Sequence, residues 1–484
     1  MKLSLSWIRD YVNIPEDADL KKLAYDLTMS TVEVEDVEYL AERFENMIVG
    51  VIEKIEPHPN ADRLRVCKVN IGSDEIKDIV CGGINLEEGM RVAVSCPGAV
   101  VRWHGEGEPV VIKNSKLRGV ESFGMICASD EIGLGELFPS ETEGEILDLS
   151  AFDVPAGTSL ADALDMNDVL LEIDNKSMTN RPDLWGHYGI AREIAALYNL
   201  PLAKIEPFRA DVQSDFKVEI EDPDRCTRYI GVEMSGVAVK PAPYKMQNRI
   251  WKVGMRPINA LVDITNYVLK EIGQPMHAFD YDQIGGHKII VKCAKDGDVF
   301  QTLDGQERKL DGTILMINDG EKEVGIAGIM GGENSKITDD VKTMLFEAAT
   351  FDGTNIRKAT KRLGLRTDAS GKFEKGLDPE NALAAMNRAC QLIEELGAGE
   401  IVGGVVDVYP NKKERVRVPF EPERINALLG TNVSVEEMLG YFKMLELDYD
   451  EAKQELIIPT FRQDLLRTAD IAEEVARFFG YANI

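Results

Sequence analysis

Short apolar runs separated by Gly, Pro and Asn turns fill the sequence between Asn46 and about Ser150. One run alternates residue by residue, with Met90, Val92, Val94 and Cys96 set against Arg91, Ala93 and Ser95. A period of two is typical of a strand with one buried face. Many short strands joined by turns favour a small closed sheet. The sequence therefore predicts a β-barrel domain over residues 40–150.

The other parts of the chain mix helical and strand patterns. Residues 1–39 show apolar helical spacing followed by alternation, which predicts a small α/β cap that packs on the later domains. In residues 151–404 we expect strands and helices, with one helix capped by Asp183 and another beginning at Asp378-Pro379. Residues 405–480 follow a Pro-Asn-Lys-Lys linker and predict helices around a strand pair, the second helix with a capping box at Ser434 and Glu437. The chain is thus predicted to be a multidomain α+β protein.

Charge and cysteine usage exclude several classes of site. The 484 residues include 55 basic and 84 acidic ones, a net charge of -29, so the protein as a whole repels nucleic acid. The seven cysteines are odd in number and never form a C-x-x-C pair, which argues against zinc or dithiol chemistry. No signal-peptide core and no uncharged apolar stretch of about 18 residues occurs. We expect a cytoplasmic protein without a membrane segment.

The predicted barrel is a local exception to the acidic charge. The segment between Asn60 and Val120 contains nine basic and eight acidic residues. Mixed surface charge on a solvated barrel explains this balance as well as an RNA site does. The residues that an RNA site would use are Arg63, Arg65, Lys68, Lys113, Lys116 and Arg118.

The order of residues in this region favours the RNA interpretation. The run His58-Pro-Asn-Ala-Asp-Arg-Leu-Arg-Val-Cys-Lys-Val69 resembles the opening of the OB-fold tRNA-binding domain found in several synthetases and tRNA chaperones. Three later segments recur in that family with similar spacing, namely 79–83, 116–122 and 124–127. The resemblance implies an OB fold that binds tRNA through a charged groove and stacking faces.

Two residues of the central region are candidates for chemistry. His277 follows a predicted helix that Pro275 ends, and such a histidine is also found as a hydrogen-bonded structural residue. Glu347 lies inside the apolar run Met344-Leu-Phe-Glu-Ala-Ala349. On an edge strand Glu347 would face solvent. In a pocket, burial would raise its pKa and make it an acid/base or recognition group.

Neighbouring motifs do not indicate a nucleotide site. The glycine-rich stretch 325–333 lacks the Gly-Lys-Ser/Thr ending of a phosphate loop and the register of a dinucleotide fingerprint. No segment resembles a synthetase ATP-binding motif. A basic stretch over 357–366 suits a phosphate backbone, although a solvated helix face would carry the same charges.

Four motifs in order resemble the editing domain of bacterial phenylalanyl-tRNA synthetase beta subunits. They are Asn180-Arg-Pro-Asp183, the segment Arg256 to Tyr267, Gln274-Pro-Met-His-Ala-Phe-Asp280, and Thr367-Asp-Ala-Ser370. In that family the domain hydrolyses tyrosine wrongly attached to the phenylalanine tRNA. The resemblance places His277 and Glu347 at the editing centre. It places Arg256, Thr265, Asn266, Thr367 and Ala369 around the substrate.

An acidic cluster lies near the end of the sequence. Asp470, Glu473 and Glu474 would share one side of a helix, and acids in a first helical turn need no metal because the helix dipole favours them. The segment also resembles the small winged-helix-like α+β domain of the same family. That resemblance makes Asp464, Asp470, Glu473 and Glu474 magnesium ligands in a site shared with the alpha subunit.

The resemblance covers the chain from Trp7 to Tyr481 and implies partners and a division of labour. The alpha subunit would use ATP to attach phenylalanine to tRNA(Phe) in an alpha2beta2 tetramer. This chain, which would stop before the family's catalytic-like and terminal RNA-binding modules, would bind tRNA and edit. The alternatives are a tRNA-binding chaperone, a free-standing aminoacyl-tRNA deacylase, and a structural subunit that has lost editing.

Overall fold

The computed structural model describes residues 1–205 and 214–484, which divide into two compact units. The first unit contains Met1–Val37 and Leu171–Ile484, and the second contains Glu38–Leu170. Each unit is described by itself. Both are mixtures of helices and strands, which confirms the predicted α+β class.

The second unit is built on a five-stranded antiparallel sheet that is nearly closed into a barrel. Its strand order is β11-β6-β3-β4-β5. The bounds are β3 (Met47–Pro57), β4 (Arg65–Asn70), β5 (Ile76–Cys81), β6 (Arg91–Ser95) and β11 (Met125–Ile126). Two hairpins flank it, β7 (Val100–Arg102) with β8 (Pro109–Val111), and β9 (Ser115–Leu117) with β10 (Val120–Ser122). The helix α3 (Leu160–Ala163) follows.

The strand predicted from residue alternation is present, but its burial differs from the prediction. Val92, Ala93, Val94 and Ser95 are all buried, so β6 has no solvent face. Later segments run alongside β6: the backbone N–H of Cys127 donates to the Ala93 carbonyl, and that of Leu149 donates to the Arg91 carbonyl.

In the first unit, the beginning of the chain packs beside a helix from much later in the sequence. The elements are β1 (Lys2–Ser4), α1 (Leu5–Ile8), α2 (Leu20–Ser30), β2 (Val34–Tyr39), β12 (Val169–Ile173) and α4 (His187–Tyr198). The fully buried Trp7 stacks on His187, with ring centroids 4.0 Å apart. Strands β1, β12 and β2 form a three-stranded sheet in that order.

The start of α4 differs from the sequence prediction. The helix begins after Gly186, so Asp183 is not its N-cap. The Asp183 carboxylate instead accepts two hydrogen bonds from Arg181, at 2.9 and 2.8 Å. Gly186 is needed where it stands, because a Cβ there would lie 2.8 Å from the Glu271 carbonyl oxygen. Glycine at position 186 therefore lets the start of α4 lie against the end of the later helix α6 (Ala260–Ile272).

The central part of the first unit has two sheets and a helical layer. One sheet has the order β15-β22-β14-β23, with β24 also paired to β14. Its bounds are β14 (Cys226–Ser235), β15 (Met276–Asp280), β22 (Thr343–Phe351), β23 (Glu400–Ile401) and β24 (Val406–Val408). The second has the order β13-β16-β19-β20-β21, with β13 (Lys217–Ile220), β16 (Lys288–Cys293), β19 (Leu315–Asn318), β20 (Glu323–Ile326) and β21 (Met330–Gly331). Strands β17 (Val299–Gln301) and β18 (Glu307–Lys309) form a separate hairpin.

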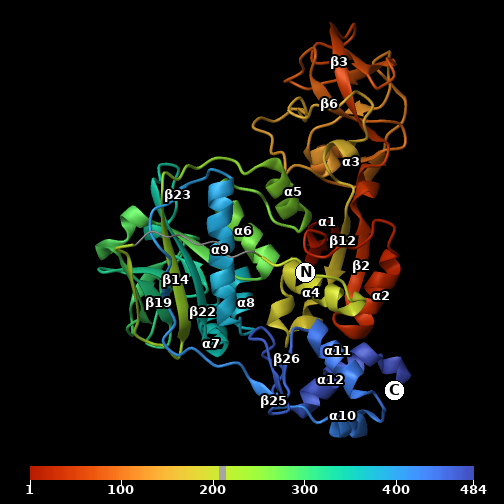
Figure 1. The fold of residues 1–484 in the computed structure, drawn as a ribbon. Coiled ribbons are helices and arrows are strands. Elements are labelled where there is room, and N and C mark those ends of the chain that lie inside the picture. The colour runs from red at the N-terminus through yellow and green to blue at the C-terminus, as the bar shows by residue number, and fades with distance from the viewer. Residues whose placement is uncertain (206–213) are drawn as a thin grey trace. The chain divides into compact units, whose positions relative to one another are not determined.

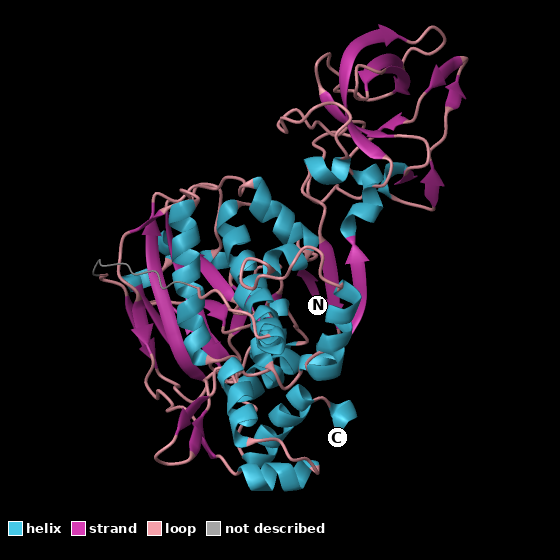
Figure 2. Ribbon diagram, turned by 45° about the vertical axis from the view of Figure 1, so that its right-hand side comes forward, coloured by secondary structure: helices cyan, strands magenta, loops and turns pink. Residues whose placement is uncertain are grey.

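Helices cover one face of the sheet that contains β22. They are α5 (Tyr244–Lys252), α6 (Ala260–Ile272) and α9 (Pro379–Glu395), and Figures 1 and 2 show α9 lying along that sheet. Helix α9 begins at the predicted Asp378, whose side chain accepts from the Glu380 backbone N–H. Ile230, Phe346 and Ala348 point into this helical core. Tyr229, Leu345 and Ala349 point the other way, into a core shared with the second sheet and with α7 (Gly353–Leu363) and α8 (Asp368–Phe373).

The last part of the chain has a three-stranded sheet and three helices. The strands are β25 (Arg417–Pro419), β26 (Asp448–Asp450) and β27 (Glu455–Ile457), in the order β25-β27-β26. The helices are α10 (Pro422–Leu429), α11 (Val435–Met444) and α12 (Thr468–Phe479). Ser434 caps α11 by accepting from the Glu437 backbone N–H, at the position the sequence predicts.

Candidate functional site

His277 and Glu347 lie directly opposite each other on neighbouring antiparallel strands. The register of β15 against β22 pairs His277 with Glu347. Directly opposed residues have Cβ atoms roughly 4.5–5.5 Å apart and project from the same face of a sheet. That face is the one turned toward the second sheet, because neighbouring residues Phe279, Leu345 and Ala349 belong to the core between the sheets. The structure therefore brings the two predicted residues together.

Glu347 is buried on a central strand rather than exposed on an edge. β22 lies between β15 and β14, and the Glu347 residue is 7% exposed. The hydroxyl of Tyr229 on β14 donates a hydrogen bond of 2.7 Å to Oε2 of Glu347. Burial raises the pKa of Glu347 to about 7, and the Tyr229 hydrogen bond opposes that rise. Among the described residues this is the one hydrogen bond to its side chain, which leaves Oε1 available to a ligand.

The imidazole of His277 is enclosed but not hydrogen-bonded within the described part of the chain. Burial lowers the pKa of His277 to about 4, so the ring is neutral near pH 7. The ring of Phe279 meets it edge-on, with centroids 4.4 Å apart. A Cβ on Gly331 would lie 2.5 Å from Cε1 and 2.6 Å from Nε2 of His277, so any larger residue there would displace the ring. A neutral imidazole with free nitrogens can accept a proton from a water molecule.

Thr367 and Ala369 approach the same place through the glycine-rich segment. The Thr367 hydroxyl donates a hydrogen bond of 2.9 Å to the Ile329 carbonyl, two residues before Gly331. Thr367 also caps α8 by accepting from the Ser370 backbone N–H. Ala369 packs on the core between the two sheets. The glycine-rich stretch is thus a close backbone passage between His277 and α8.

Three other predicted pocket residues lie farther from the pair. Thr265 and Asn266 are half-buried on α6, whose apolar face packs on the opposite surface of the sheet. The Thr265 hydroxyl donates to the Val262 carbonyl of its own helix. Arg256 is exposed in the loop between α5 and α6. In the described residues no polar contact joins these three side chains to His277 or Glu347, and their role stays a prediction.

Two contacts bring the hairpin that carries Lys116 and Arg118 beside the loop that carries Arg63. The His58 ring nitrogen Nε2 lies 3.1 Å from the Leu117 carbonyl, and the Asn60 amide donates to the Arg118 carbonyl at 3.0 Å. These contacts hold the β9–β10 hairpin beside the loop before β4. Arg63, Arg65, Lys113, Lys116 and Arg118 are exposed, whereas Lys68 is half-buried and paired with Asp78 at 2.9 Å.

Comparison with known proteins identifies three domains along the chain. The model of the B3/4 domain matches residues 225–398, which contain His277 and Glu347. The tRNA binding domain matches residues 47–158, and the tRNA synthetase B5 domain matches residues 418–481. Over 491 residues, the phenylalanine--tRNA ligase beta subunit of Clostridium tetani is 42% identical, covering 100% of this chain and 60% of that protein. The chain belongs to the phenylalanine--tRNA ligase beta-subunit family.

Other matches agree with this family. The beta subunit of Clostridium acetobutylicum is 42% identical over 495 residues, covering 100% of this chain and 60% of that protein. The chain therefore spans about 60% of the length of these relatives. A solved N-terminal fragment of the beta subunit from Pyrococcus horikoshii aligns at 17% identity with a TM-score of 0.35, over 65% of this chain and 88% of that one.

Membership of the beta-subunit family implies a magnesium site at the acidic cluster, but the side chains do not fit one. Both oxygens of Asp464 accept from Arg462, at 2.9 and 2.8 Å. Glu474 accepts from Arg462 at 2.7 Å and from Arg477 at 2.6 Å. Asp470 accepts from the backbone N–H groups of Leu466 and Arg467. Arginines and backbone donors therefore occupy the oxygens that a metal ion would need.

No group of three His, Cys, Asp or Glu residues in the described ranges is placed to hold a metal ion. Glu473, the fourth predicted ligand, is exposed. The magnesium site stays a prediction, and ester hydrolysis at His277 and Glu347 would not depend on it. In the same ranges, no helix is both long and apolar enough to cross a membrane.

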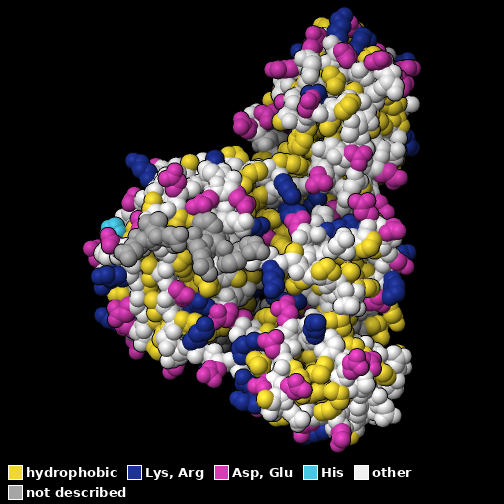
Figure 3. Space-filling view, in the orientation of Figure 1, with side chains coloured by type: hydrophobic (Ala, Val, Ile, Leu, Met, Phe, Trp, Pro, Cys, Tyr) yellow, Lys and Arg dark blue, Asp and Glu magenta, His cyan; other side chains and the backbone are white. Residues whose placement is uncertain are grey.

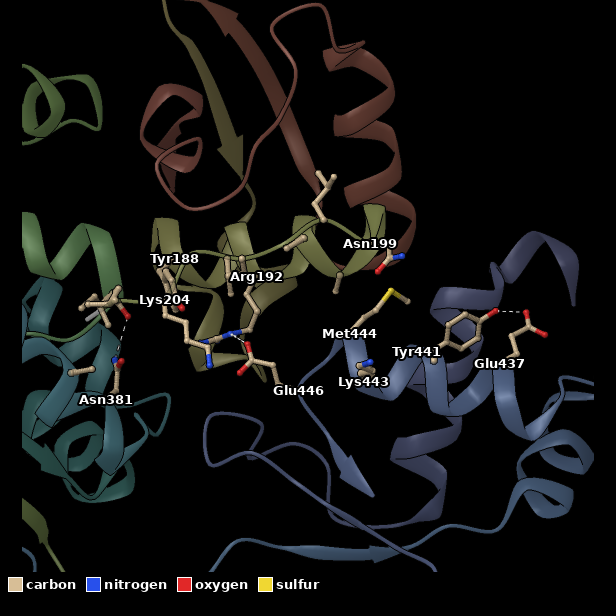
Figure 4. A pocket seen from close by; sticks show the side chains of 18 residues that line it. Tyr188, Arg192, Asn199, Lys204, Asn381, Glu437, Tyr441, Lys443, Met444 and Glu446 are labelled. Atoms are coloured by element: carbon tan, nitrogen blue, oxygen red, sulfur yellow. Dashed lines mark hydrogen bonds and ion pairs between the residues drawn. The ribbon is translucent and has the colours of Figure 1, made fainter. Parts of the chain in front are cut away.

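A separate cavity, away from the His277–Glu347 pair, has a volume of about 990 Å³. It lies between α4 and α11 (Figure 4). Arg192 reaches across to Glu446 at 3.2 Å, and Tyr441 donates to Glu437 on the same helix. Neither His277 nor Glu347 lines it. Its size therefore does not mark it as the site of chemistry.

Sequence reasoning missed two residues of the site. Tyr229 is a single tyrosine in an apolar strand, 118 positions before Glu347, and no local signal links them. Gly331 lies in the glycine-rich stretch 325–333, and nothing in that stretch indicates the His277 ring beside it. Tyr229 could be found only by pairing β14 with β22, and Gly331 only by packing β21, which belongs to the other sheet, against His277.

Proposed function

We propose that this chain binds tRNA(Phe) and hydrolyses tyrosine from mischarged tyrosyl-tRNA(Phe). It would do so as the non-aminoacylating beta subunit of phenylalanine--tRNA ligase. The alpha subunit would carry out the ATP-dependent attachment of phenylalanine in an alpha2beta2 tetramer. The observation that carries this proposal is the direct opposition of His277 and Glu347 on β15 and β22.

Glu347 supplies the discrimination between tyrosine and phenylalanine. The two amino acids differ by one hydroxyl, and an apolar pocket separates such a pair poorly. Oε1 of Glu347 would accept the hydrogen bond of the tyrosyl hydroxyl, while Oε2 keeps the bond from Tyr229. A phenylalanyl ester would bury that oxygen without a partner, at a cost of about 1–3 kcal/mol.

His277 prepares the water that attacks the ester. Its ring is neutral near pH 7 because burial lowers its pKa to about 4. One nitrogen would accept the proton of the attacking water as the new bond to the carbonyl carbon forms. The proton would then pass to the leaving ribose oxygen. The close contact with Gly331 holds the ring in place for this step.

The remaining predicted residues complete the proposal around this pair. Thr367 and Ala369 would line the amino-acid side of the site through the Ile329–Gly331 segment. Arg256, Thr265 and Asn266 would contact the ribose or the amino group after a local rearrangement. On the barrel, the six basic residues defined above would contact the tRNA backbone.

We also propose the finer division of the chain. It consists of a cap at 1–39, an OB-fold domain at 40–150, an editing domain at 151–404 and a winged-helix-like domain at 405–480. We propose a cytoplasmic location, where tRNA charging takes place. The three family matches support the order of these domains, and the proposed boundaries extend beyond the matched residues.

Incubating the chain with tyrosyl-tRNA(Phe) and phenylalanyl-tRNA(Phe), and measuring release of each amino acid, tests the proposal. Faster release of tyrosine is expected. A tRNA-binding chaperone would retain both charged tRNAs intact, and either that result or equal release would contradict the proposal. Adding the alpha subunit distinguishes a free-standing deacylase, whose rate and affinity would not respond to it.

A further inference from the structure

A second concave site in the first unit has five basic side chains and one acidic side chain among its lining residues. The basic pocket, as we call it, has a volume of about 610 Å³. Its charged side chains are Lys176, Lys270, Arg366, Lys372, Lys375 and the single acid Asp368. This composition is unusual in a chain with a net charge of -29. None of these residues belongs to the His277–Glu347 pair or to the barrel.

The centre of the basic pocket is a buried lysine with a fixed position. Lys372 is 7% exposed, and its ammonium donates to the Trp185 carbonyl at 3.0 Å. The ammonium also lies 5.2 Å from the centroid of the Trp185 ring. Burial and the nearby ammonium of Lys270 lower the pKa of Lys372 to about 7. Burial also lowers the pKa of Lys270. Two ammonium groups are thus held close together, an arrangement that an anion would relieve.

Most of the positive charge in the basic pocket is not neutralised within the described chain. Arg366 pairs with Glu374, and Lys375 lies 4.0 Å from the same carboxylate. Lys176, Lys270 and Lys372 form no ion pair with any described residue. Asp368 partly opposes the fall in pKa of both Lys270 and Lys372, so one acid faces two buried or half-buried ammonium groups. Such an excess of cations is the environment in which phosphate groups bind.

The positive surface continues beyond the basic pocket. An adjacent hollow of about 690 Å³ shares Arg366 and Lys375 with it and adds Arg357 and Lys361 from α7. A single small anion would need only one such hollow. Two adjoining basic hollows fit a chain of phosphates better than one isolated phosphate.

The basic pocket borders the proposed editing site through Thr367. That residue lines the pocket, and its hydroxyl donates to the Ile329 carbonyl. Gly331, two residues later, packs on the ring of His277. The segment from Ile329 to Gly331 therefore connects the basic pocket to His277. A polyanion bound among the lysines would lie near the proposed editing site.

We propose that the basic pocket binds phosphodiester groups of the tRNA acceptor strand while the aminoacyl ester lies at His277 and Glu347. This inference rests on the proposed editing function. The lysines place the RNA and take no part in bond breaking. The same chemistry would recognise free phosphate, so the experiment separates the two sources.

The test compares two double variants of this chain. Lys270→Gln with Lys375→Gln removes two charges from the basic pocket and keeps a polar side chain that is shorter by one atom. The control, Lys412→Gln with Lys453→Gln, removes the same charge from exposed positions outside it. One substrate is tyrosyl-tRNA(Phe), and the other is the tyrosyl ester of adenosine, which has the reacting bond but no phosphate.

The pocket variant should lose about tenfold in kcat/KM for tyrosyl-tRNA(Phe), and its log–log salt dependence should flatten by roughly 0.7–0.9 per lost phosphate contact. Hydrolysis of the adenosine ester should be unchanged, and the control should match the unaltered chain with both substrates. An unchanged rate and salt slope in the pocket variant would overturn the proposal. So would tight binding of inorganic phosphate, measured by calorimetry, together with an unchanged response to tRNA.

Failure of the editing function gives a different result. In that case the unaltered chain would release tyrosine from neither substrate. The salt dependence of tRNA affinity in the two variants would still test the basic pocket. A pocket variant with the affinity and slope of the control would then reject RNA binding there.

Discussion

The hydroxyl of Tyr229 and the carboxylate of Glu347 are joined by a buried hydrogen bond of 2.7 Å. The protein thus places a phenol of its own against one oxygen of the carboxylate proposed to recognise a tyrosyl phenol. Tyr229 is fully buried, so it is a fixed part of the core rather than a mobile competitor. It determines which oxygen of Glu347 a substrate can reach.

Tyr229→Phe should weaken editing without removing a reacting group. The hydrogen bond from Tyr229 lowers the pKa of Glu347, so its loss should raise that pKa further above about 7. The pH profile of tyrosine release should move to higher pH, and the selectivity for tyrosine should fall by about tenfold, equivalent to about 1.4 kcal/mol. Stopped-time assays of tyrosyl-tRNA(Phe) between pH 6 and pH 9 measure both. A profile superimposable on that of the unaltered chain would show that Tyr229 does not act through Glu347.

Gly331→Ala should abolish most of the activity and leave the fold intact. The new methyl group would lie 2.5 Å from Cε1 of His277, so the ring must move. A displacement of about 1 Å in a catalytic group can cost 10²-fold in rate. Gly440→Ala on α11 is the matched control, because a Cβ there meets no atom within 4 Å. Equal deacylation rates in the two variants would argue against a role for the His277 position.

Glu347→Gln should stabilise the protein at high pH and not at low pH. The folded pKa of Glu347 is about 7, above the usual 4.5, so the native state binds the proton more tightly than the unfolded state. The contribution of Glu347 to the free energy of unfolding is fully present below pH 4.5 and is lost as the pH rises through 7. Glutamine removes that loss, which is about 3 kcal/mol.

Urea unfolding of both proteins at pH 5 and pH 8 checks this sign. The midpoint of Glu347→Gln should exceed that of the unaltered chain at pH 8 and approach it at pH 5. The opposite pH dependence would mean that Glu347 is ionised and well paired in the folded protein.

Arg462→Met should be strongly destabilising. Arg462 is 1% exposed and binds both Asp464 and Glu474, so its loss leaves two enclosed carboxylates short of a partner. Breaking a buried pair by removing one partner costs about 3–5 kcal/mol. Chemical denaturation should show this loss, whereas magnesium chloride should not shift the midpoint of the unaltered chain. A magnesium-dependent rise in that midpoint would show that the ion displaces the arginines.

Much of the fold follows from local sequence signals. Asp378 and Ser434 cap helices where the pattern predicts them, because each cap depends on residues within three positions. Asp183 does not cap the predicted helix, because its carboxylate is paired with Arg181. That arginine belongs to a buried charge network with Glu193 and Arg477. Such a network forms only after α4 and α12 pack together.

The site could be predicted in part. The apolar run around Glu347 indicates a buried strand, but only the sheet order shows that β22 is central and that His277 faces Glu347. The acidic cluster gives the reverse case. Its spacing permits a metal site, and the fold instead commits Asp464 and Glu474 to Arg462. Contacts between strands far apart in sequence decide the first outcome, whereas an arginine within 12 positions of both acids decides the second.

The most direct measurement is the ratio of tyrosine to phenylalanine release from charged tRNA(Phe), in the unaltered chain and in Glu347→Ala. We expect the unaltered chain to favour tyrosine strongly. In the variant, tyrosine release should slow and phenylalanine release should rise or stay the same, so that the ratio approaches one. Unchanged rates for both substrates in Glu347→Ala would contradict the account.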